Sequence, residues 1–328
     1  MKIIRLHTTD PYYNLAVEEY LFLHSEHDVF MLWQNARTVV IGKNQNAYAE
    51  LDVDYARKQG IRIARRITGG GAVYHDMGNL NFTYISTKKG QNEIDFATFC
   101  APIIEFLRSM GVEATLSGRN DILVGDKKIS GNAQYSANGR VLHHGTLLYN
   151  SDLSVLSNVL RADPEKLKAK AIRSVSSRVM NLCDALPLDG GVDELAEAII
   201  SSLMAKNVGE WADVPQNAEI DALAKRNASD AWLFPERAYL SEYSLTKKRR
   251  YPFGSVELTL QMSGDTVQVA RINGDFFGNE PVSDIEQILC GAKRGEVSER
   301  LQNLDVQRYI FGMTNGEIID LINEAFRV

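Results

Sequence analysis

Apolar residues that recur every three or four positions predict two amphipathic helices in the first third of the chain. The first lies within residues 8–23, with Thr9 or Asp10 as its N-cap and Pro11 in its first turn. The second lies within residues 95–111, where an aspartate precedes the apolar stripe and a glycine follows it.

Short apolar or alternating runs predict strands between these helices. The runs at 29–33 and 38–42 are almost wholly apolar, the run at 61–65 leads directly into three glycines, and the run at 80–86 alternates. A short helix is predicted at 52–60, where a glycine ends the pattern.

Residues 120–150 have the pattern of an antiparallel meander. A strand at 121–124 turns through Gly-Asp into a second strand, and Asn-Gly at 138–139 is a strong hairpin signal before the return at 140–150. Helices mixed with strands that short turns connect indicate an α+β fold, because the regular strand–helix alternation of a doubly wound sheet is absent.

In the second half of the chain the sequence pattern changes at two places. Residues 161–178 are basic and weakly patterned, which indicates a surface helix followed by a loop, and 192–206 predict another amphipathic helix. A cluster of charge, proline and glycine near residue 247 then marks a domain boundary. We therefore expect a first domain over 1–246 and a second over 247–328, the latter with a hairpin followed by helices.

Composition and charge narrow the functional classes. Of 328 residues, 45% are hydrophobic and 24% charged, as in ordinary globular proteins, and the net charge is −6. A protein that binds nucleic acid mainly by electrostatics is usually basic, so no nucleic-acid partner is expected. No apolar run reaches the ~18 residues of a membrane span or forms a signal-peptide core, so we expect a soluble cytoplasmic monomer without a membrane partner. Three widely spaced cysteines indicate reduced thiols.

The sequence RRITGGGAVYHD is the first candidate for chemistry. Glycine costs up to about 1 kcal/mol relative to alanine in regular structure, so Gly69, Gly70 and Gly71 together indicate a sharp bend or a close approach. Their N–H groups can bind an anion, and Arg65 and Arg66 supply guanidinium groups suited to carboxylate or phosphate. The loop matches neither a Walker A motif nor a dinucleotide fingerprint. A flexible turn beside solvated arginines is the alternative.

The second candidate is a polar strand face. Strand alternation places Lys128 on one face with Ser130 and Asn132, and places Gly131 on the other. A plain solvent-facing strand would have the same pattern. Glycine is unfavourable inside a strand, however, and here it indicates that another group approaches closely.

Two further polar pairs flank this strand. Asp121, which follows Asn120, is a candidate Mg²⁺ ligand, although an Asn-Asp pair also initiates turns. Alternation puts His144 on one face of its strand and His143 on the other, and strand histidines are often structural. The residues together indicate a cationic pocket for a carboxylate, a phosphate or both, without identifying the substrate.

The blocks RRITGGGAVYHD, SGRNDILVGDKKISGNAQ, HHGTLL and SVSSRVMNL, in this order and spacing, resemble the lipoate–protein ligase family, densely over residues 1–183 and more loosely beyond. The resemblance implies a large domain of the biotin/lipoate ligase type, related to class II synthetases, with a mixed, largely antiparallel sheet and flanking helices. It also implies a small α+β C-terminal accessory domain. In this family lipoate and ATP give lipoyl-AMP, and the lipoyl group then passes to a lysine of an acceptor domain in 2-oxoacid dehydrogenase complexes or the glycine-cleavage H protein.

The resemblance also implies residue roles. Lys128 matches the catalytic lysine that contacts the lipoate carboxylate and the α-phosphate, and Asp121 is the candidate ligand for Mg²⁺ on the phosphates. The residues that match positions binding ATP and lipoyl-AMP are Arg66, Gly70, Gly71, Ala72, Val73, Tyr74, Asn120, Asp121, Lys128 and His144.

Two further sets follow from the resemblance. Trp33 and Val40 are candidates to wall the dithiolane and its alkyl chain. The segment 161–178 matches a loop that folds over the adenylate, with Arg173 and Arg178 as candidates within it.

Three other functions share some of these features. An octanoyl or lipoyl transferase that works without ATP can use a cysteine nucleophile, but Cys100 lies in an apolar helix stripe and reads as a core thiol. A non-catalytic sensor of lipoate or a nucleotide would need the same pocket. A biotin ligase is disfavoured, because its Gly-Arg-Gly-Arg pattern is missing.

Overall fold

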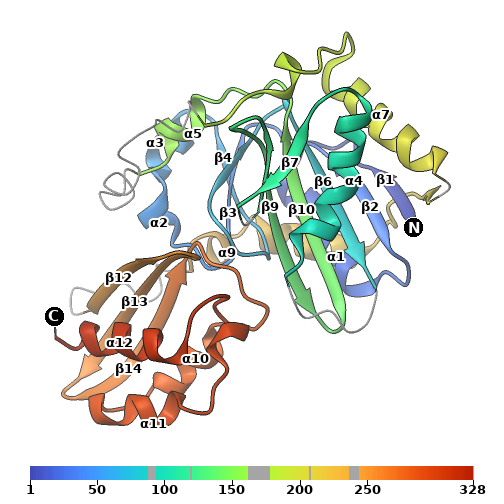
Figure 1. The fold of residues 1–328 in the computed structure, drawn as a ribbon. Helices are drawn as coiled ribbons and strands as arrows, with labels where there is room; N and C mark the ends of the chain where they lie inside the picture. The colour runs from blue at the N-terminus through green and yellow to red at the C-terminus, as the bar shows by residue number, and fades with distance from the viewer. Residues whose placement is uncertain (88–93, 119, 162–177, 207, 236–243, 328) are drawn as a thin grey trace.

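The computed structural model describes residues 1–87, 94–118, 120–161, 178–206, 208–235 and 244–327, which form a larger and a smaller part (Figure 1). The strands of the larger part are β1 (Lys2–Arg5), β2 (Val29–Trp33), β3 (Thr38–Ile41), β4 (Arg62–Arg65), β5 (Val73–His75), β6 (Asn79–Ser86), β7 (Ala114–Ser117), β8 (Asp121–Val124), β9 (Lys127–Ala137), β10 (Arg140–Leu148) and β11 (Glu210–Trp211). Its α-helices are α1 (Pro11–His24), α2 (Ala47–Glu50), α3 (Val53–Lys58), α4 (Phe96–Ser109), α5 (Val155–Val159), α7 (Gly191–Ala205), α8 (Ala218–Asn227) and α9 (Asp230–Leu233).

Eight strands form one mixed sheet in the order β11-β1-β2-β6-β10-β9-β8-β7. The pairs of β1 with β2 and with β11 are parallel, and the other pairs are antiparallel. The hairpin of β9 and β10 turns through Asn138 and Gly139, whose φ values are 54° and 71°. This is the conformation that Asn-Gly favours, so the meander and the largely antiparallel sheet are confirmed.

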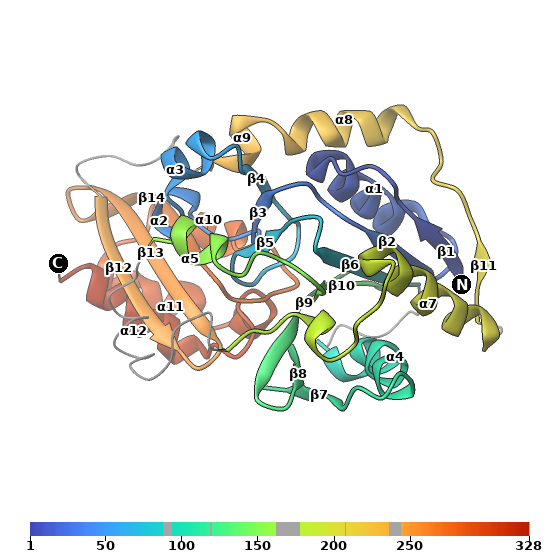
Figure 2. The ribbon, with the colours of Figure 1, turned by 90° about the horizontal axis from the view of Figure 1, so that it is seen from above.

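Helices cover both faces of this sheet (Figure 2). Leu80 and Phe82 of β6 point into an apolar cluster with α4 and α7, whereas Met31 and Trp33 of β2 pack with α1. The intervening positions Asn79, Asn81 and Thr83 of β6 are polar, and Asn81 lines a cavity together with Gly70 and Gly71 of the glycine loop. Local sequence positions the covering helices: Asp10 accepts hydrogen bonds from the first turn of α1, so this residue is the N-cap.

A second, three-stranded sheet in the order β4-β3-β5 carries the glycine loop. The strands β3 and β4 are parallel, β3 and β5 are antiparallel, and the loop joins β4 to β5. The glycine loop is thereby held against the polar face of the large sheet. None of the helices in the described ranges has the length and apolar character needed to cross a bilayer.

The smaller part is a three-stranded antiparallel sheet covered by helices. Its elements are β12 (Ser244–Tyr251), β13 (Gly254–Ser263), β14 (Thr266–Gly274), α10 (Ser283–Leu289), α11 (Val297–Leu301) and α12 (Asn315–Ala325). Strand β12 crosses the expected limit between residues 246 and 247, and the division there stays a prediction. The two parts touch where Gly274 donates its N–H to the Asn44 carbonyl at 2.8 Å.

Candidate functional site

Arg66 fixes the path of the glycine loop. Its side chain is buried and donates from Nη2 to the carbonyls of Gly69 and Gly71, each at 2.8 Å. It also donates from Nε to Thr68 Oγ1 at 3.0 Å and from Nη1 to the Val40 carbonyl at 3.2 Å. Burial lowers the pKa of Arg66 to about 10, so the guanidinium stays charged at neutral pH. It is therefore a buried clamp, and its interpretation as a solvated charge is wrong.

Arg65 is also buried, but it faces away from the loop. Its guanidinium donates to backbone carbonyls in two segments, residues 42–45 and 232–233. Five charge-assisted hydrogen bonds to carbonyls offset the cost of burying the cation. Arg65 thus ties β4 to its neighbouring segments, and for this arginine too the solvated alternative is wrong.

The three glycines have three different surroundings. A Cβ on Gly69 would lie 2.2 Å from the carbonyl oxygen of Phe276, and a Cβ on Gly70 would lie 3.0 Å from the ring of Phe277. Gly70 has a φ of 94° and donates its N–H to the same Phe276 oxygen at 3.1 Å. Around Gly71, apart from its chain neighbours, no atom of the described residues lies within 4 Å of a Cβ position. The residues Phe276 and Phe277 of the smaller part therefore pack against Gly69 and Gly70, whereas the space beside Gly71 is not filled by the described residues.

A β-bulge in β9 changes the residues that accompany Lys128. Pairing with β8 skips Ile129, so the side-chain alternation shifts by one residue between Lys128 and Ser130. A Cβ on Gly131 would lie 2.7 Å from Lys128 Nζ, which puts these two residues on the same face. The prediction that Lys128 shares a face with Ser130 and Asn132 is therefore wrong, because regular alternation ends at a bulge. The group that approaches Gly131 closely is the ammonium end of the Lys128 side chain, and no backbone atom lies as near.

Lys128 is held from two sides. Its Nζ lies 2.7 Å from Asp121 Oδ1 in an ion pair whose side chains are about one-third exposed. Its backbone N–H donates to the Arg178 carbonyl at 2.7 Å, and its carbonyl accepts from Met180 N at 3.0 Å. Asn120, which precedes β8, donates from its side-chain Nδ2 to the Asn132 carbonyl of β9 at 2.6 Å. The ammonium group is therefore positioned before any substrate binds.

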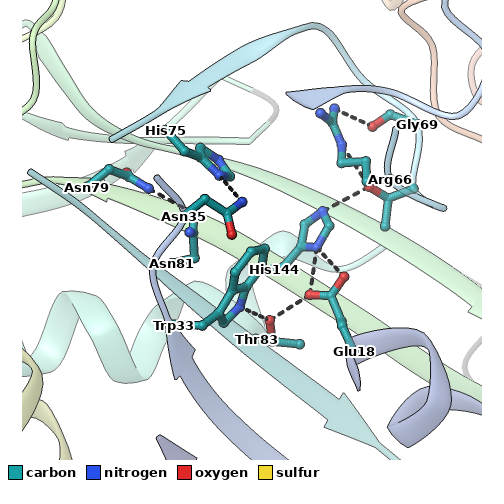
Figure 3. A network of polar contacts seen from close by, with 11 residues as sticks. Glu18, Trp33, Asn35, Arg66, Gly69, His75, Asn79, Asn81, Thr83 and His144 are labelled. Atoms are coloured by element: carbon teal, nitrogen blue, oxygen red, sulfur yellow. Dashed lines mark hydrogen bonds and ion pairs between the residues drawn. The ribbon is translucent and has the colours of Figure 1, made fainter. Parts of the chain in front are cut away.

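A buried hydrogen-bond chain connects α1 to the glycine loop (Figure 3). Glu18 accepts from His144 Nδ1 at 2.9 Å, and His144 Nε2 lies 2.9 Å from Thr68 Oγ1. Glu18 also accepts from Thr83 Oγ1 at 2.7 Å, and Thr83 accepts from Trp33 Nε1 at 2.9 Å. Trp33 and the loop are thereby held at fixed positions relative to one buried carboxylate.

Two adjoining cavities lie between the glycine loop and the large sheet. The first has a volume of about 130 Å³ and the second about 370 Å³. The residues lining both are Ala72, Val73, Lys128, Gly131 and Thr146. Trp33 and Val40 line the first, whereas the second is bordered by charged side chains. Lys128 therefore stands where the smaller cavity adjoins the larger one.

All ten residues predicted for the binding site line these cavities. The first is lined by Arg66, Gly70, Gly71, Ala72, Val73, Asn120, Lys128 and His144. The second is lined by Ala72, Val73, Tyr74, Asp121 and Lys128. Arg178 also lines the second, whereas Arg173 and most of the 161–178 segment lie outside the described residues. The structure brings these residues together, and their roles towards ligands stay predictions.

The structure adds three residues to the site that were not among the predicted ones. His75 and Asn81 line the first cavity, and Glu18 lies at the start of the buried chain. A signal for Asn81 was present, because Asn79, Asn81 and Thr83 put a polar residue at every second position of an otherwise apolar strand. A polar row on a buried strand face needs partners or a ligand.

Cys100 and His143 lie together on the opposite face of the sheet, outside both cavities. Cys100 Sγ is 3.8 Å from His143 Nε2, and both residues are fully buried among phenylalanines. Burial raises the pKa of Cys100 to about 12 and lowers the pKa of His143 to about 3, so both groups are neutral. The pair lacks the thiolate that nucleophilic catalysis requires, and the interpretation of Cys100 as a core thiol is confirmed.

The acidic residues of the site fit a metal ion that arrives with a ligand. In the described parts of the chain, no group of three or more His, Cys, Asp or Glu side chains is arranged to hold a metal. Asp121 and Asp126 line the second cavity. Mg²⁺ is typically bound by one or two carboxylates together with phosphate oxygens and water, so the number of carboxylates here is compatible with such an ion.

Comparison with known proteins covers nearly the whole chain. Residues 10–204 match the family described as the lipoyl protein ligase A/B catalytic domain, and residues 241–322 match the bacterial lipoate protein ligase C-terminus. The chain is 35% identical over 321 residues to lipoate-protein ligase LplJ of Bacillus subtilis, covering 95% of this chain and 97% of the relative.

Solved structures of similar fold are also found. LipL1 of P. falciparum in complex with lipoate has the same fold, with a TM-score of 0.81 and 24% identity over 98% of this chain and 99% of that one. A lipoate-protein ligase A bound with ATP is 28% identical, with a TM-score of 0.59, over 71% of this chain and 98% of that chain.

Proposed function

The chain belongs to the lipoate–protein ligase family, a family of enzymes, and we propose that it attaches lipoate to a lysine of lipoyl-acceptor domains in an ATP-dependent reaction. In the first step the lipoate carboxylate attacks the α-phosphorus of ATP, which gives lipoyl-AMP and pyrophosphate. In the second step the ε-amine of the acceptor lysine attacks the acyl carbon, and AMP leaves. Acceptor domains of 2-oxoacid dehydrogenase complexes and the glycine-cleavage H protein are the proposed partners.

The observation that carries this proposal is the position of Lys128 at the junction of two adjoining cavities, of about 130 and 370 Å³. The first cavity, with Leu15, Trp33 and Val40 in its wall, suits the acyl chain. The second, larger cavity suits the nucleotide, and a structure of a relative has been solved with ATP bound. The bond that forms between carboxylate and α-phosphate would therefore lie at the junction, beside the ammonium group.

The charge of Lys128 supplies the main electrostatic contribution in this mechanism. Negative charge accumulates on the α-phosphoryl oxygens as the carboxylate attacks, and a preorganised cation stabilises it without reorganisation. Asp121 holds Nζ in place before binding, at 2.7 Å, and then shares it with the incoming carboxylate. No covalent enzyme intermediate is needed, because positioning and charge stabilisation suffice.

The glycine loop has a positioning role. Arg66 fixes two loop carbonyls, and Gly71 leaves room in the wall where the adenylate would pass. Asp121 and Asp126 would hold Mg²⁺ on the phosphates, where the ion neutralises charge on the pyrophosphate leaving group. We propose that the remaining predicted residues contact the adenylate along the cavity wall that the glycine loop forms.

Lipoate-dependent exchange of label between pyrophosphate and ATP tests this function. We expect exchange with the parent protein and its loss, by at least a hundredfold, in Lys128→Ala. Lys127→Ala is the matched control, because Lys127 is the adjacent, exposed lysine of the same strand and should exchange at the parent rate.

Each alternative function has its own outcome in this assay. Lipoate binding without exchange would indicate a sensor, and acyl transfer to an acceptor domain without ATP would indicate a transferase. Exchange by Lys128→Ala at the parent rate would refute the role of Lys128 while leaving the ligase reaction in place.

A further inference from the structure

Glu18 is a buried carboxylate of α1 whose hydrogen-bond donors come from two strands of the large sheet. Its side chain is 1% exposed. Oε1 accepts from His144 Nδ1 at 2.9 Å and from Thr83 Oγ1 at 2.7 Å, and Oε2 lies 3.0 Å from the same histidine nitrogen. A buried carboxylate is stable only when donors and an opposite charge compensate for lost hydration. Glu18 therefore requires a positive charge nearby.

Arg66 is a buried cation whose own contacts are uncharged. In the described part of the chain its guanidinium donates to three carbonyls and to Thr68 Oγ1. Burial lowers the pKa of Arg66, and the negative charge of Glu18 acts in the opposite direction. Opposite charges attract more strongly in the protein interior than in water. Glu18 and Arg66 therefore compensate each other across the side chains that lie between them.

His144 and Thr68 connect these two charges (Figure 3). A carboxylate only accepts hydrogen bonds, so His144 Nδ1, at 2.9 Å from Glu18 Oε1, carries a proton. His144 Nε2 lies 2.9 Å from Thr68 Oγ1, which accepts from Arg66 Nε at 3.0 Å. Both ring nitrogens of His144 are thus engaged within the protein, and neither is free for a ligand while this chain is intact.

The chain ends on the part of the glycine loop that lines the first cavity. Arg66 Nη2 donates to the carbonyls of Gly69 and Gly71, each at 2.8 Å, and Gly70 and Gly71 line that cavity. A shift of the Arg66 side chain would move both carbonyls and the wall between them. A misplacement of about 1 Å at a reacting centre can cost on the order of a hundredfold in rate.

We propose that Glu18 is a positioning residue for the adenylate-forming step. It compensates the charge of Arg66 and, through His144 and Thr68, fixes the glycine loop against the large sheet. This inference rests on the proposed function. Glu18 is not among the described residues that line the two cavities, so it acts without touching the ligand. His144 serves in this chain as a link and not as a proton acceptor for the reaction, because both of its ring nitrogens are engaged.

Glu18→Gln and Glu19→Gln are a matched pair of variants. Both residues are buried glutamates of α1, but Glu19 accepts from Arg226 Nη1 of α8 at 2.8 Å and makes no contact with the loop. Each substitution removes one charge at nearly constant volume. We expect kcat of pyrophosphate exchange, per folded molecule, to fall roughly ten- to a hundredfold in Glu18→Gln, with KM for lipoate and ATP within about threefold. Glu19→Gln should keep the parent kcat even where its stability falls.

Hydrogen exchange of the loop amides is a second measurement, which needs no activity. Mass spectrometry of peptides over residues 68–72 reports how firmly the loop is held. We expect these amides to exchange at least about tenfold faster in Glu18→Gln than in the parent, and at the parent rate in Glu19→Gln.

Variants of Thr68 test whether Glu18 acts through this residue. Thr68→Val removes the hydroxyl at nearly constant volume, and Thr68→Ser restores it. We expect Thr68→Val to lose about as much kcat as Glu18→Gln, and Thr68→Ser to recover most of that loss. The double variant Glu18→Gln/Thr68→Val should be no slower than the slower single variant, because two changes that break one chain do not add.

The outcomes separate this inference from the proposed function. Equal changes in Glu18→Gln and Glu19→Gln, or losses that multiply in the double variant, would overturn the positioning role. If the parent catalyses no exchange, the proposed function fails, and hydrogen exchange of the loop still decides the inference. If Glu18→Gln does not fold, Glu18→Asp takes its place in every comparison, because it keeps the charge but withdraws the carboxylate from His144 Nδ1.

Discussion

Replacing Gly69 with alanine tests the contact between the glycine loop and the smaller part. The added Cβ would lie 2.2 Å from the Phe276 carbonyl oxygen and 3.1 Å from Phe277 Cα. Ordinary contacts are about 3.5 Å, so the two segments must separate by roughly 1 Å. The hydrogen bond from Gly70 N to Phe276 O, now 3.1 Å, would then be lost.

The expected cost is about 2–4 kcal/mol. Overpacking contributes about 1–3 kcal/mol and the lost hydrogen bond about 1 kcal/mol. For 328 residues the entropy of unfolding is about 0.7 kcal/mol per kelvin, so Tm should fall by about 3–6 °C. If the smaller part unfolds in its own transition, that transition should move further, because its entropy of unfolding is smaller.

Scanning calorimetry of Gly69→Ala beside Gly71→Ala measures this effect. At Gly71 no atom of the described residues, apart from the chain neighbours, lies within 4 Å of the added Cβ, and φ is not positive, so Tm should stay within about 1 °C of the parent. A Gly69→Ala protein as stable as Gly71→Ala would refute the close packing of Phe276 on the loop.

Two further predictions concern the core behind the sheet. His143→Phe should reduce the loss of stability in acid. Between pH 6.5 and about 3, residue 143 binds a proton in the unfolded state but not in the folded state, so the parent loses up to about 1.4 kcal/mol of unfolding free energy per pH unit through this group as pH falls. Urea midpoints measured from pH 7 to 5 should therefore fall less steeply in the variant than in the parent. Parallel slopes would contradict the neutral state of His143. Cys100→Ala should keep the parent rate of ATP-dependent lipoyl transfer. Native Cys100 should also resist alkylation until the protein unfolds, because its thiol is buried and its pKa is raised to about 12. Loss of transfer in a folded variant would favour a cysteine mechanism.

Much of the fold follows from local sequence. Asp10 and Pro11 start α1, and the Asn-Gly pair at 138–139 forms the turn between β9 and β10, because caps and tight turns depend on a few adjacent residues. The ordered motifs also indicated the family, and the ten predicted site residues lie around two adjoining cavities.

Tertiary structure decided the points that depend on distant segments. The bulge at Ile129 depends on pairing with β8, and it alone puts Lys128 on the face of Gly131. The function of the first two glycines depends on Phe276, about two hundred positions away, which no local pattern indicates. The contact between His75 Nδ1 and Asn35 Nδ2 joins two separate segments, which no local pattern indicates. Local sequence thus determined where elements begin, end and turn, whereas packing between elements determined which side chains are buried and which hydrogen bonds they make.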